Sequence, residues 1–451
     1  MTSFSPNIEW QISPWHERYL PRSDSQDGDH RTPFQRDKAR VLHSAAFRRL
    51  QAKTQVLGVG LSDFYRTRLT HSLEAAQIGS GITSQLQGKY PQEAAYVGLD
   101  GMLIETLCLA HDIGHPPFGH GGEVALNYMM RDHDGFEGNG QTFRIVTKLE
   151  PYTQSHGMNL SRRSLLGLVK YPNFLDTLSA EQPAAVTSTH RTVIAKNWVP
   201  AKGLFRCDQG HYEWMMAPFS QQDKDIFSTF NQFSDKHSKT QYKSLDCSIM
   251  ELADDIAYGI HDLEDAIAMG MIDQTQFVDS IVQPIIKLDV PWLSKEINVI
   301  QQKLFSSEHH IRKNTIGALV NCFITSIELS TLNTFEHPLL DFNVAFPPAH
   351  KKALDIFKLF VYQHVILKPE IQILEYKGQQ VVMELFEAFS SDPERLLPTN
   401  TAKRWLAAKE DGNEYRVIAD YISGMTDEFA SRLYSNMFIP KRGGTHDTLS
   451  L

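Results

Sequence analysis

The stretch LCLAHDIGHPPFGHGGE at residues 107–123 combines a short apolar run with an unusual density of ligand-type side chains. It contains three histidines, one aspartate and one glutamate, together with four glycines and a Pro-Pro pair. Proline and glycine end a helix and leave open backbone beside it. The stretch is therefore either a metal-centred active site behind an apolar helix or a helix end with unusual turn residues.

The pattern of apolar residues along the chain is mainly that of α-helices. The clearest case is SLDCSIMELADDIAYGIHDLEDAIA at residues 244–268, where apolar residues recur every three or four positions and so form one buried face. Similar patterns predict helices at residues 37–53, 67–82, 98–112, 123–130, 290–306, 310–330, 349–366, 370–390 and 413–435. Alternating patterns typical of strands are scarce, so we expect a mainly α fold, with loops near residues 20–36, 132–140, 150–160, 171–220 and 390–400.

Length and composition indicate an ordinary globular protein. The chain has 451 residues, of which 41% are hydrophobic and 22% charged. No apolar run reaches the roughly 18 residues that a membrane-spanning helix needs, and the N-terminus MTSFSPNIEW lacks a signal-peptide pattern. The four cysteines form no CxxC pair, which favours free thiols in a reducing compartment. We therefore expect a cytoplasmic protein with no membrane partner.

Charge is distributed unevenly. The net charge of −9 argues against a protein that coats nucleic acid. Residues 31–53, however, contain seven basic residues against one acidic residue. A local basic region in an acidic protein suits a compact polyanion such as a nucleoside triphosphate, but a solvated helix face explains the same counts equally well.

The helix at residues 244–268 also carries polar groups on its buried side. Asp254 lies between two residues of the apolar face, with Tyr258 one turn and Asp262 two turns further on. A carboxylate, a phenol and a second carboxylate on successive turns need a functional or a structural reason. The leading structural alternative is a buried ion pair of Asp254 with Arg68.

A second set of candidate ligands comes from the histidine-rich stretch. His111 and Asp112 are adjacent, so both reach one ion only at a helix edge, and His71 begins another predicted helix. With Asp254 they form a mixed nitrogen and oxygen set that favours Mn²⁺, Fe²⁺, Mg²⁺ or a catalytic Zn²⁺ over a closed cysteine-type zinc site. Spacing alone does not join residues so far apart in the sequence.

The pattern H…HD…D, with HDIGHPPFGHGGE around its central pair, resembles the HD phosphohydrolase superfamily. Longer blocks look like bacterial dGTP triphosphohydrolases and their close relatives, and this resemblance runs over nearly the whole chain. The blocks are RTPFQRDKARVLHSAAFRRLQAKTQV (31–56), TRLTHSLEAAQIG (67–79), FEGNGQTFRI (136–145), GMNLSRRSLLGLVKYP (157–172), ELADDIAYGIHDLEDAI (251–267) and DYISGMTDEFA (420–430).

The resemblance implies a role for particular residues. The implied metal ligands are His71, His111, Asp112 and Asp254. The implied catalytic pair is His120 and Glu123, and the implied contacts to deoxyribose and phosphate are Gln55, Arg68, Tyr258 and Asp262. Tyr258 would stack under the sugar and exclude a 2′-hydroxyl by shape. His115 would lie near the ion without a defined role, and Lys202 is a candidate for holding the γ-phosphate.

The resemblance also implies a reaction and its partners. The reaction is hydrolysis of dGTP, or of dNTPs generally, at the α-phosphorus, which releases a deoxynucleoside and tripolyphosphate. The cofactor would be a divalent ion, Mn²⁺ or Mg²⁺ first and Fe²⁺, Co²⁺, Ni²⁺ or Zn²⁺ as alternatives. A homo-oligomer such as a hexamer, and an allosteric dNTP or single-stranded DNA, are further implied partners. The chain has no Walker A pattern, so a P-loop mechanism is not supported.

These inferences give an HD-domain helical core with additional N- and C-terminal helices. We expect a basic segment at residues 1–60 packed on the core, a catalytic core at 61–270 and a C-terminal helical region at 271–451, in one compact body. Two other functions stay open at this point. One is an HD enzyme that acts on nucleoside monophosphates or cyclic nucleotides, and the other is a nucleotide- or single-strand-binding regulator with a vestigial metal site.

Overall fold

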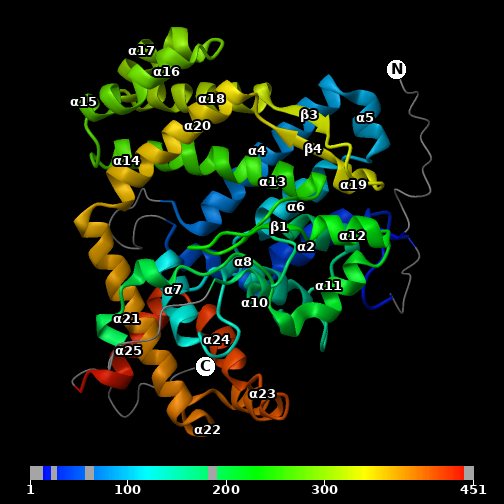
Figure 1. Cartoon of the computed structure of the whole chain (residues 1–451). Coiled ribbons are helices and arrows are strands. Elements are labelled where there is room, and N and C mark those ends of the chain that lie inside the picture. Colours follow the sequence, from blue (N-terminus) through cyan, green and yellow to red (C-terminus); the bar gives the residue numbers. More distant parts are fainter. Residues whose placement is uncertain (1–13, 22–27, 56–65, 181–189, 441–451) are drawn as a thin grey trace.

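Helices dominate the computed structural model of the protein, which describes residues 14–21, 28–55, 66–180 and 190–440 (Figure 1). Within these ranges, the strands form only two small antiparallel sheets, β1 (Phe230–Asn231) with β2 (Lys239–Thr240) and β3 (Glu328–Thr331) with β4 (Phe342–Ala345). The mainly α fold predicted from the sequence is confirmed. None of the helices in the described ranges combines the length and the apolar character needed to span a bilayer.

A group of packed helices forms the centre of the molecule. Its members are α2 (Pro33–His43), α4 (Arg68–Lys89), α6 (Gly101–Ala110), α9 (Arg162–Leu168) and α13 (Leu245–Ile256). Helix α6 is buried on nearly all sides, as its almost uniformly apolar sequence requires. Gly79 allows α4 to approach α6 closely, since a Cβ there would lie 2.8 Å from the sulfur of Cys108. The close contact brings the N-terminal end of α4 towards the C-terminal end of α6.

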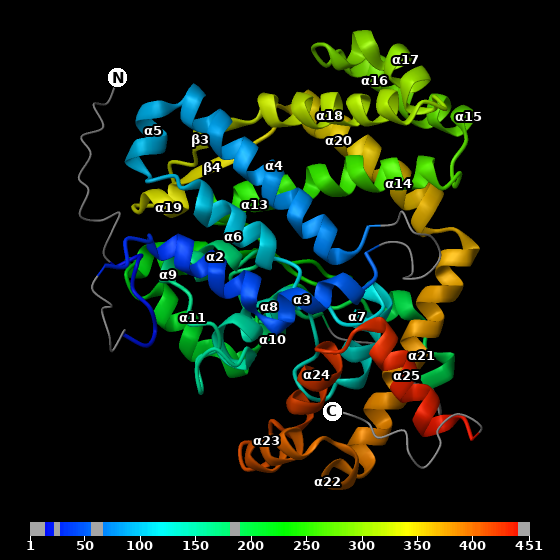
Figure 2. The same ribbon diagram turned by 180° about the vertical axis from the view of Figure 1, so that it is seen from behind.

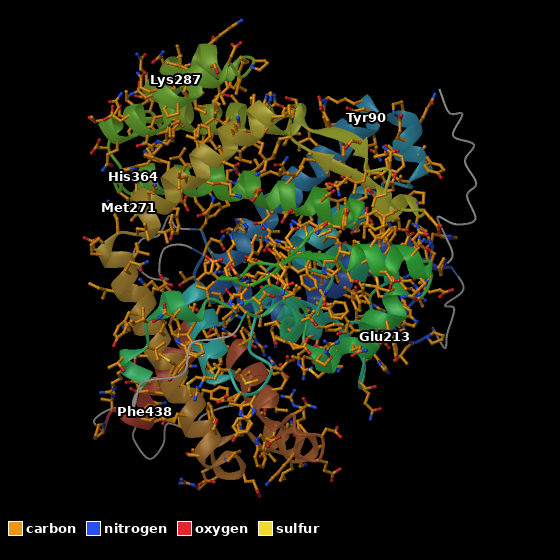
Figure 3. All side chains as sticks on the ribbon, in the orientation of Figure 1. Tyr90, Glu213, Met271, Lys287, His364 and Phe438 are labelled. Atoms are coloured by element: carbon orange, nitrogen blue, oxygen red, sulfur yellow. The ribbon has the colours of Figure 1, made fainter. Side chains whose placement is uncertain are left out.

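A second hydrophobic cluster joins the histidine-rich stretch to the C-terminal part of the chain. It contains α7 (Gly119–Met129), α21 (Pro369–Ser391), α24 (Glu414–Ser423) and α25 (Asp427–Phe438). In Figures 1 and 2, α21 runs along one side of the molecule and leads down to α22 (Pro393–Leu396) and α23 (Thr399–Lys409). Gly121 lets α7 contact α21, because a Cβ there would lie 2.8 Å from the carbonyl oxygen of Glu375. The side chains drawn in Figure 3 fill the space between the ribbons.

Several predicted helices differ from the observed ones for local reasons. The predicted helix at 37–53 is broken at Ser44, whose backbone is extended and whose hydroxyl caps α3 (Ala45–Arg49) by accepting from Phe47 N–H. The predicted helix at 413–435 is two helices, α24 and α25, with Thr426 capping the second. The prediction for 310–330 is wrong at its end, because residues 328–331 pair with β4.

Two further differences concern 244–268 and 171–220. Residues 245–268 are helical, but a π-helical turn at Ala257–His261 separates α13 from α14 (Asp262–Ala268). The stretch 171–220 contains α11 (Gln209–Met216), where we expected a loop. The helix predicted at 310–330 is α18 (His309–Ser326), and the other predicted helices are present with shifted ends, including α17 (Leu293–Leu304) and α20 (Pro348–Val361). The domain boundaries at 60 and 270 remain predictions, and residue 60 lies outside the described ranges.

Arg144 links the two parts of the interior. It ends α8 (Gly138–Arg144), and its guanidinium donates from Nη1 to Asp208 at 3.0 Å and from Nη2 to Asp420 at 2.9 Å. All three side chains are buried. Asp420 belongs to α24, so this ion pair fixes the C-terminal helices to the segment that follows the histidine-rich stretch.

We expect Arg144→Met to lower the free energy of unfolding by about 3–5 kcal/mol, because it leaves two buried carboxylates without their shared partner. Denaturant unfolding followed by circular dichroism measures the change. Arg395→Met is the control, since Arg395 pairs with Asp392 on an exposed surface and its loss should change stability little. Equal stability of the two variants would contradict the linking role of Arg144.

Candidate active site

Two histidines and two aspartates that are far apart in the sequence meet at the centre of the fold. Nε2 of His71 lies 3.1 Å from Oδ1 of Asp254, and Nε2 of His111 lies 3.4 Å from the same oxygen. Nε2 of His111 is also 3.3 Å from Oδ1 of Asp112. The ligand atoms of His71, His111 and Asp112 all lie within 4.8 Å of one another. The structure thus brings together all four side chains that the resemblance implies as ligands.

Local structure sets the position of each of these groups. Thr67 caps α4 through a hydrogen bond from Thr70 N–H, which places His71 in the first turn of the helix. His111 follows the last residue of α6, and its Nδ1 lies 2.6 Å from the carbonyl oxygen of Cys108. Nδ1–H donates to that carbonyl, so Nε2 keeps its lone pair and points towards the two aspartates.

The donor set fits a divalent cation. Nε2 of His111 is buried and has no hydrogen-bond partner among the described residues, and an unpaired buried polar atom is costly. Neighbouring ligands on a six-coordinate ion with bonds near 2.1 Å lie about 3 Å apart, close to the distances of 3.1–3.4 Å found here. Imidazole and carboxylate ligands are typical of Mn²⁺, Fe²⁺ or catalytic Zn²⁺ sites.

Two cations neutralise the aspartates of the cluster. Arg68 donates from Nη1 to Asp112 Oδ2 at 2.6 Å, and Lys170 donates to Asp254 Oδ2 at 2.9 Å. Burial alone would raise the pKa of Asp254, but Lys170 and His111 outweigh it and hold that pKa well below its usual range. Both carboxylates are therefore ionised and ready to bind a cation at neutral pH.

These contacts correct one structural alternative and add one residue. Arg68 pairs with Asp112, so an ion pair between Arg68 and Asp254 is wrong. Lys170 occupies that position instead, and sequence reasoning did not identify it. The block GLVKYP at residues 167–172 matched relatives of the chain, but nothing in the sequence indicates which residue Lys170 contacts.

His115 lies between the cluster and a second polar group. Its Nδ1 is 3.2 Å from Oδ1 of Asp112, and its ring lies 6.2 Å from that of His120. Burial and the nearby Arg68 lower the pKa of His115 to about 3. The imidazole is therefore neutral and adds no positive charge to the site.

His120 and Glu123 form a second pair at the start of α7. Nδ1 of His120 lies 3.1 Å from Oε2 of Glu123, and the His120 side chain is 73% exposed whereas that of Glu123 is 3% exposed. The other oxygen of Glu123 accepts from Gly138 N–H and from Lys202, each at 2.9 Å. Glu123 is thus held by several partners, and it orients an exposed imidazole whose Nε2 has no hydrogen-bond partner among the described residues.

Lys202 contacts two carboxylates in this arrangement. Its ammonium group lies 2.9 Å from Glu123 and 3.0 Å from Glu137. The interaction holds the pKa of Glu123 well below its usual range, against the effect of burial. Lys202 therefore binds the oxygen of Glu123 that does not face His120.

Tyr258 and Asp262 follow Asp254 on the same long helix. Tyr258 lies within the π-helical turn, which interrupts the regular helical register that the sequence predicts. Such turns occur frequently at functional sites. Burial raises the pKa of Asp262 to about 7, so this carboxyl group is partly protonated at neutral pH. A protonated carboxyl group can donate a hydrogen bond as well as accept one.

A cavity of about 490 Å³ opens beside His120. Its lining includes Gln55, Phe118 and Gly119, together with Leu374 and Glu375 of α21. The side-chain oxygen of Gln55 is buried and has no hydrogen-bond partner in the described part of the chain. The volume lies in the range of sites that bind small molecules.

Comparison with protein families supports the description of the core. Residues 68–171 match the HD domain, and residues 344–436 match the phosphohydrolase-associated domain. The first match includes His71, His111 and Asp112, whereas Asp254 lies between the two matched regions. The predicted HD-domain core is confirmed, and the protein is by class a metal-dependent HD phosphohydrolase.

Comparison with similar proteins shows to which family within this class the chain belongs. A deoxyguanosinetriphosphate triphosphohydrolase-like protein of Shewanella pealeana is 60% identical over 95% of this chain and 96% of its own length. Proteins with the same description from Shewanella halifaxensis and Shewanella woodyi are 57% and 58% identical over 96% of this chain and 97% of their own lengths. The chain belongs to the family of deoxyguanosinetriphosphate triphosphohydrolase-like proteins.

We expect Asp254→Ala to lose Mn²⁺ binding, because it removes the carboxylate that faces both imidazoles. Isothermal titration with Mn²⁺ measures the affinity. Asp255→Asn is the matched control, since Asp255 is the next residue on α13 but pairs with Lys358. Wild-type Mn²⁺ affinity in Asp254→Ala would rule out the four-residue cluster as the metal site.

Proposed function

We propose that the protein hydrolyses deoxynucleoside triphosphates, with dGTP preferred, to a deoxynucleoside and tripolyphosphate. The observation that carries this proposal is the joint presence of the four-residue cluster and the His120–Glu123 pair, linked through His115. Relatives that share more than half of their residues with this chain are described as deoxyguanosinetriphosphate triphosphohydrolase-like. The proposal extends that description to the activity of this chain.

The metal ligands in this proposal are His71, His111, Asp112 and Asp254. A divalent ion held there, Mn²⁺ or Mg²⁺ first, would polarise the α-phosphate and lower the pKa of the attacking water. Arg68 fixes the orientation of Asp112 through its hydrogen bond.

The acid–base group in this proposal is His120. Glu123 accepts a hydrogen bond from Nδ1–H and so keeps a proton on that nitrogen. The same contact orients the ring so that Nε2 faces away from Glu123. From that position Nε2 either gives a proton to the departing 5′-oxygen or takes one from water. High exposure of His120 allows it to reach a substrate in the adjoining cavity.

The remaining residues of the proposal hold the substrate. Gln55, whose amide oxygen lacks a partner in the described ranges, and the partly protonated Asp262 would bind the hydroxyl of the deoxyribose. Tyr258 would pack against the sugar and exclude a 2′-hydroxyl by shape. Lys170 and Arg68 place positive charge beside the cluster, where the phosphates would lie.

The cavity supports the preference for guanine. Its wall combines the apolar Ile371 and Leu374 with the carboxylate of Glu375. Apolar side chains suit the face of a base, and a carboxylate accepts from two neighbouring N–H groups, which guanine carries at N1 and N2. A homo-oligomer and an effector, either a dNTP or single-stranded DNA, remain proposals that rest on the family alone.

Incubation of the purified chain with Mn²⁺ and each dNTP, singly and in pairs, tests the proposed reaction. We expect tripolyphosphate in the ³¹P NMR spectrum and free deoxynucleoside by chromatography, with no turnover after metal removal by a chelator. Release of orthophosphate from monophosphates would favour a different HD reaction. Salt-sensitive binding of single-stranded DNA without any turnover would favour a regulator.

We expect His120→Ala to lower kcat by a factor of about 10²–10⁴, because the variant removes acid–base catalysis. Binding of Mn²⁺ should be retained, since His120 makes no contact with the four ligands in the described structure. Steady-state kinetics at saturating dGTP, with titration of Mn²⁺ alongside, give both quantities. Wild-type kcat in this variant would exclude His120 from the reaction.

A further inference from the structure

A carboxylate from the C-terminal region contacts the backbone of two segments that line the His120 cavity. Asp427, the first residue of α25, is 6% exposed. Its Oδ1 accepts from Phe118 N–H at 2.9 Å, and its Oδ2 accepts from Thr54 N–H at 2.9 Å and from the Thr54 hydroxyl. Three donors from two distant segments thus converge on one side chain.

The contact to Phe118 acts at the start of α7. Phe118 precedes the helix with a left-handed backbone, φ of 64°, and its own side chain offers no cap. Helix N-termini leave backbone N–H groups unpaired and favour a negative charge nearby. Asp427 provides both an acceptor and a charge there, two residues before His120. It does so from a part of the chain 309 residues away.

The contact to Thr54 acts on a neighbouring segment that also lines the cavity. Thr54 immediately precedes Gln55, and both residues line the cavity together with Phe118 and Asp427. Because each oxygen of Asp427 binds one of the two segments, the carboxylate fixes the separation between the segment of Gln55 and the segment of His120.

Lys53 reinforces the same connection. Its ammonium group is buried and donates to the carbonyl oxygen of His115 at 2.5 Å and to that of Ser423 at 2.8 Å. Ser423 ends α24, four residues before Asp427. Lys53 and Thr54 therefore both bind the C-terminal helices, through Ser423 and Asp427. Lys53 also binds the loop that precedes His120, through the carbonyl oxygen of His115.

We propose that Asp427 is a positioning residue, which sets the distance between the acid–base His120 and the sugar-binding Gln55. This role rests on the proposed function of those two residues. It gives the phosphohydrolase-associated region a role in the reaction, since α25 aligns His120 of the HD region with Gln55, which precedes that region. Small displacements of reacting groups cost much activity, so loss of this contact should reduce turnover more than metal binding.

The test compares Asp427→Asn with Asp223→Asn in the full-length chain. Asparagine replaces one of the two carboxylate oxygens with an NH2 group, so either the Phe118 N–H or the Thr54 N–H loses its acceptor. Asp223 is the matched control, because it is equally buried and also bridges two backbone N–H groups, those of Glu336 and His337, at 2.9 and 3.0 Å. Its helix, α12 (Gln221–Phe227), lies on the opposite side of the molecule from α25 (Figure 1).

We expect Asp427→Asn to lower kcat for dGTP about tenfold or more with unchanged Mn²⁺ affinity. Asp223→Asn should keep the wild-type kcat even if it lowers the melting temperature by as much as Asp427→Asn does. Thr54→Val, which removes one hydrogen bond and keeps the volume, should lower kcat less and in the same direction. This variant decides the matter if Asp427→Asn does not fold.

Hydrogen exchange provides a readout that does not depend on turnover. The amides of His115 and of residues 118–122 should exchange faster in Asp427→Asn than in the wild type, and should be unchanged in Asp223→Asn. Unchanged exchange, or unchanged kcat per folded molecule, in Asp427→Asn would overturn the positioning role. If the wild type hydrolyses no dNTP, the proposed function fails by itself, and the exchange measurement still decides whether Asp427 holds the loop.

Discussion

Asp112 and Asp254 direct two carboxylates at the same imidazole nitrogen of His111, within 3.4 Å, in the interior of the protein. Two carboxylates that face one nitrogen repel each other unless cations compensate their charge. Arg68 and Lys170 supply that compensation from outside the cluster, one for each carboxylate. A divalent ion added to this arrangement leaves an excess of positive charge, which suits a substrate with a triphosphate chain. The packing of α4, α6 and α13 brings Arg68, Asp112 and Asp254 together, and Lys170 reaches them from the segment that follows α9.

The sequence predicted the mainly α class of the fold, but it did not predict where helices break or where strands pair. Periodicity predicted the helix at 244–268 because its apolar face is long and regular, yet the π-helical turn at Ala257–His261 leaves no mark in that pattern. The break at Ser44 depends on a single extended residue that becomes a cap. Residues 328–331 form a strand only because β4 is available as a partner, and pairing of this kind is decided by tertiary structure rather than by local preference.

The candidate site also has a part that the sequence predicted and a part that it did not. The resemblance placed His71, His111, Asp112 and Asp254 in one set, and the structure brings them together. The partners of these residues were beyond sequence reasoning, because they depend on contacts across long separations. Lys170 reaches Asp254 over 84 positions and Asp427 reaches Thr54 over 373. The roles of Lys170 and Asp427 depend on the backbone and side-chain atoms that they contact in the folded chain. The spacing of residues along the sequence does not reveal these contacts.

Hydrolysis of dGTP in ¹⁸O-labelled water with Mn²⁺ tests the central claim most directly. Attack of water on the α-phosphorus transfers the label to a terminal phosphorus of tripolyphosphate, where mass spectrometry detects it. We expect one ¹⁸O atom in each tripolyphosphate and none in the deoxyguanosine. Label in the deoxyguanosine, or formation of dGMP and pyrophosphate or of dGDP and orthophosphate, would contradict this claim.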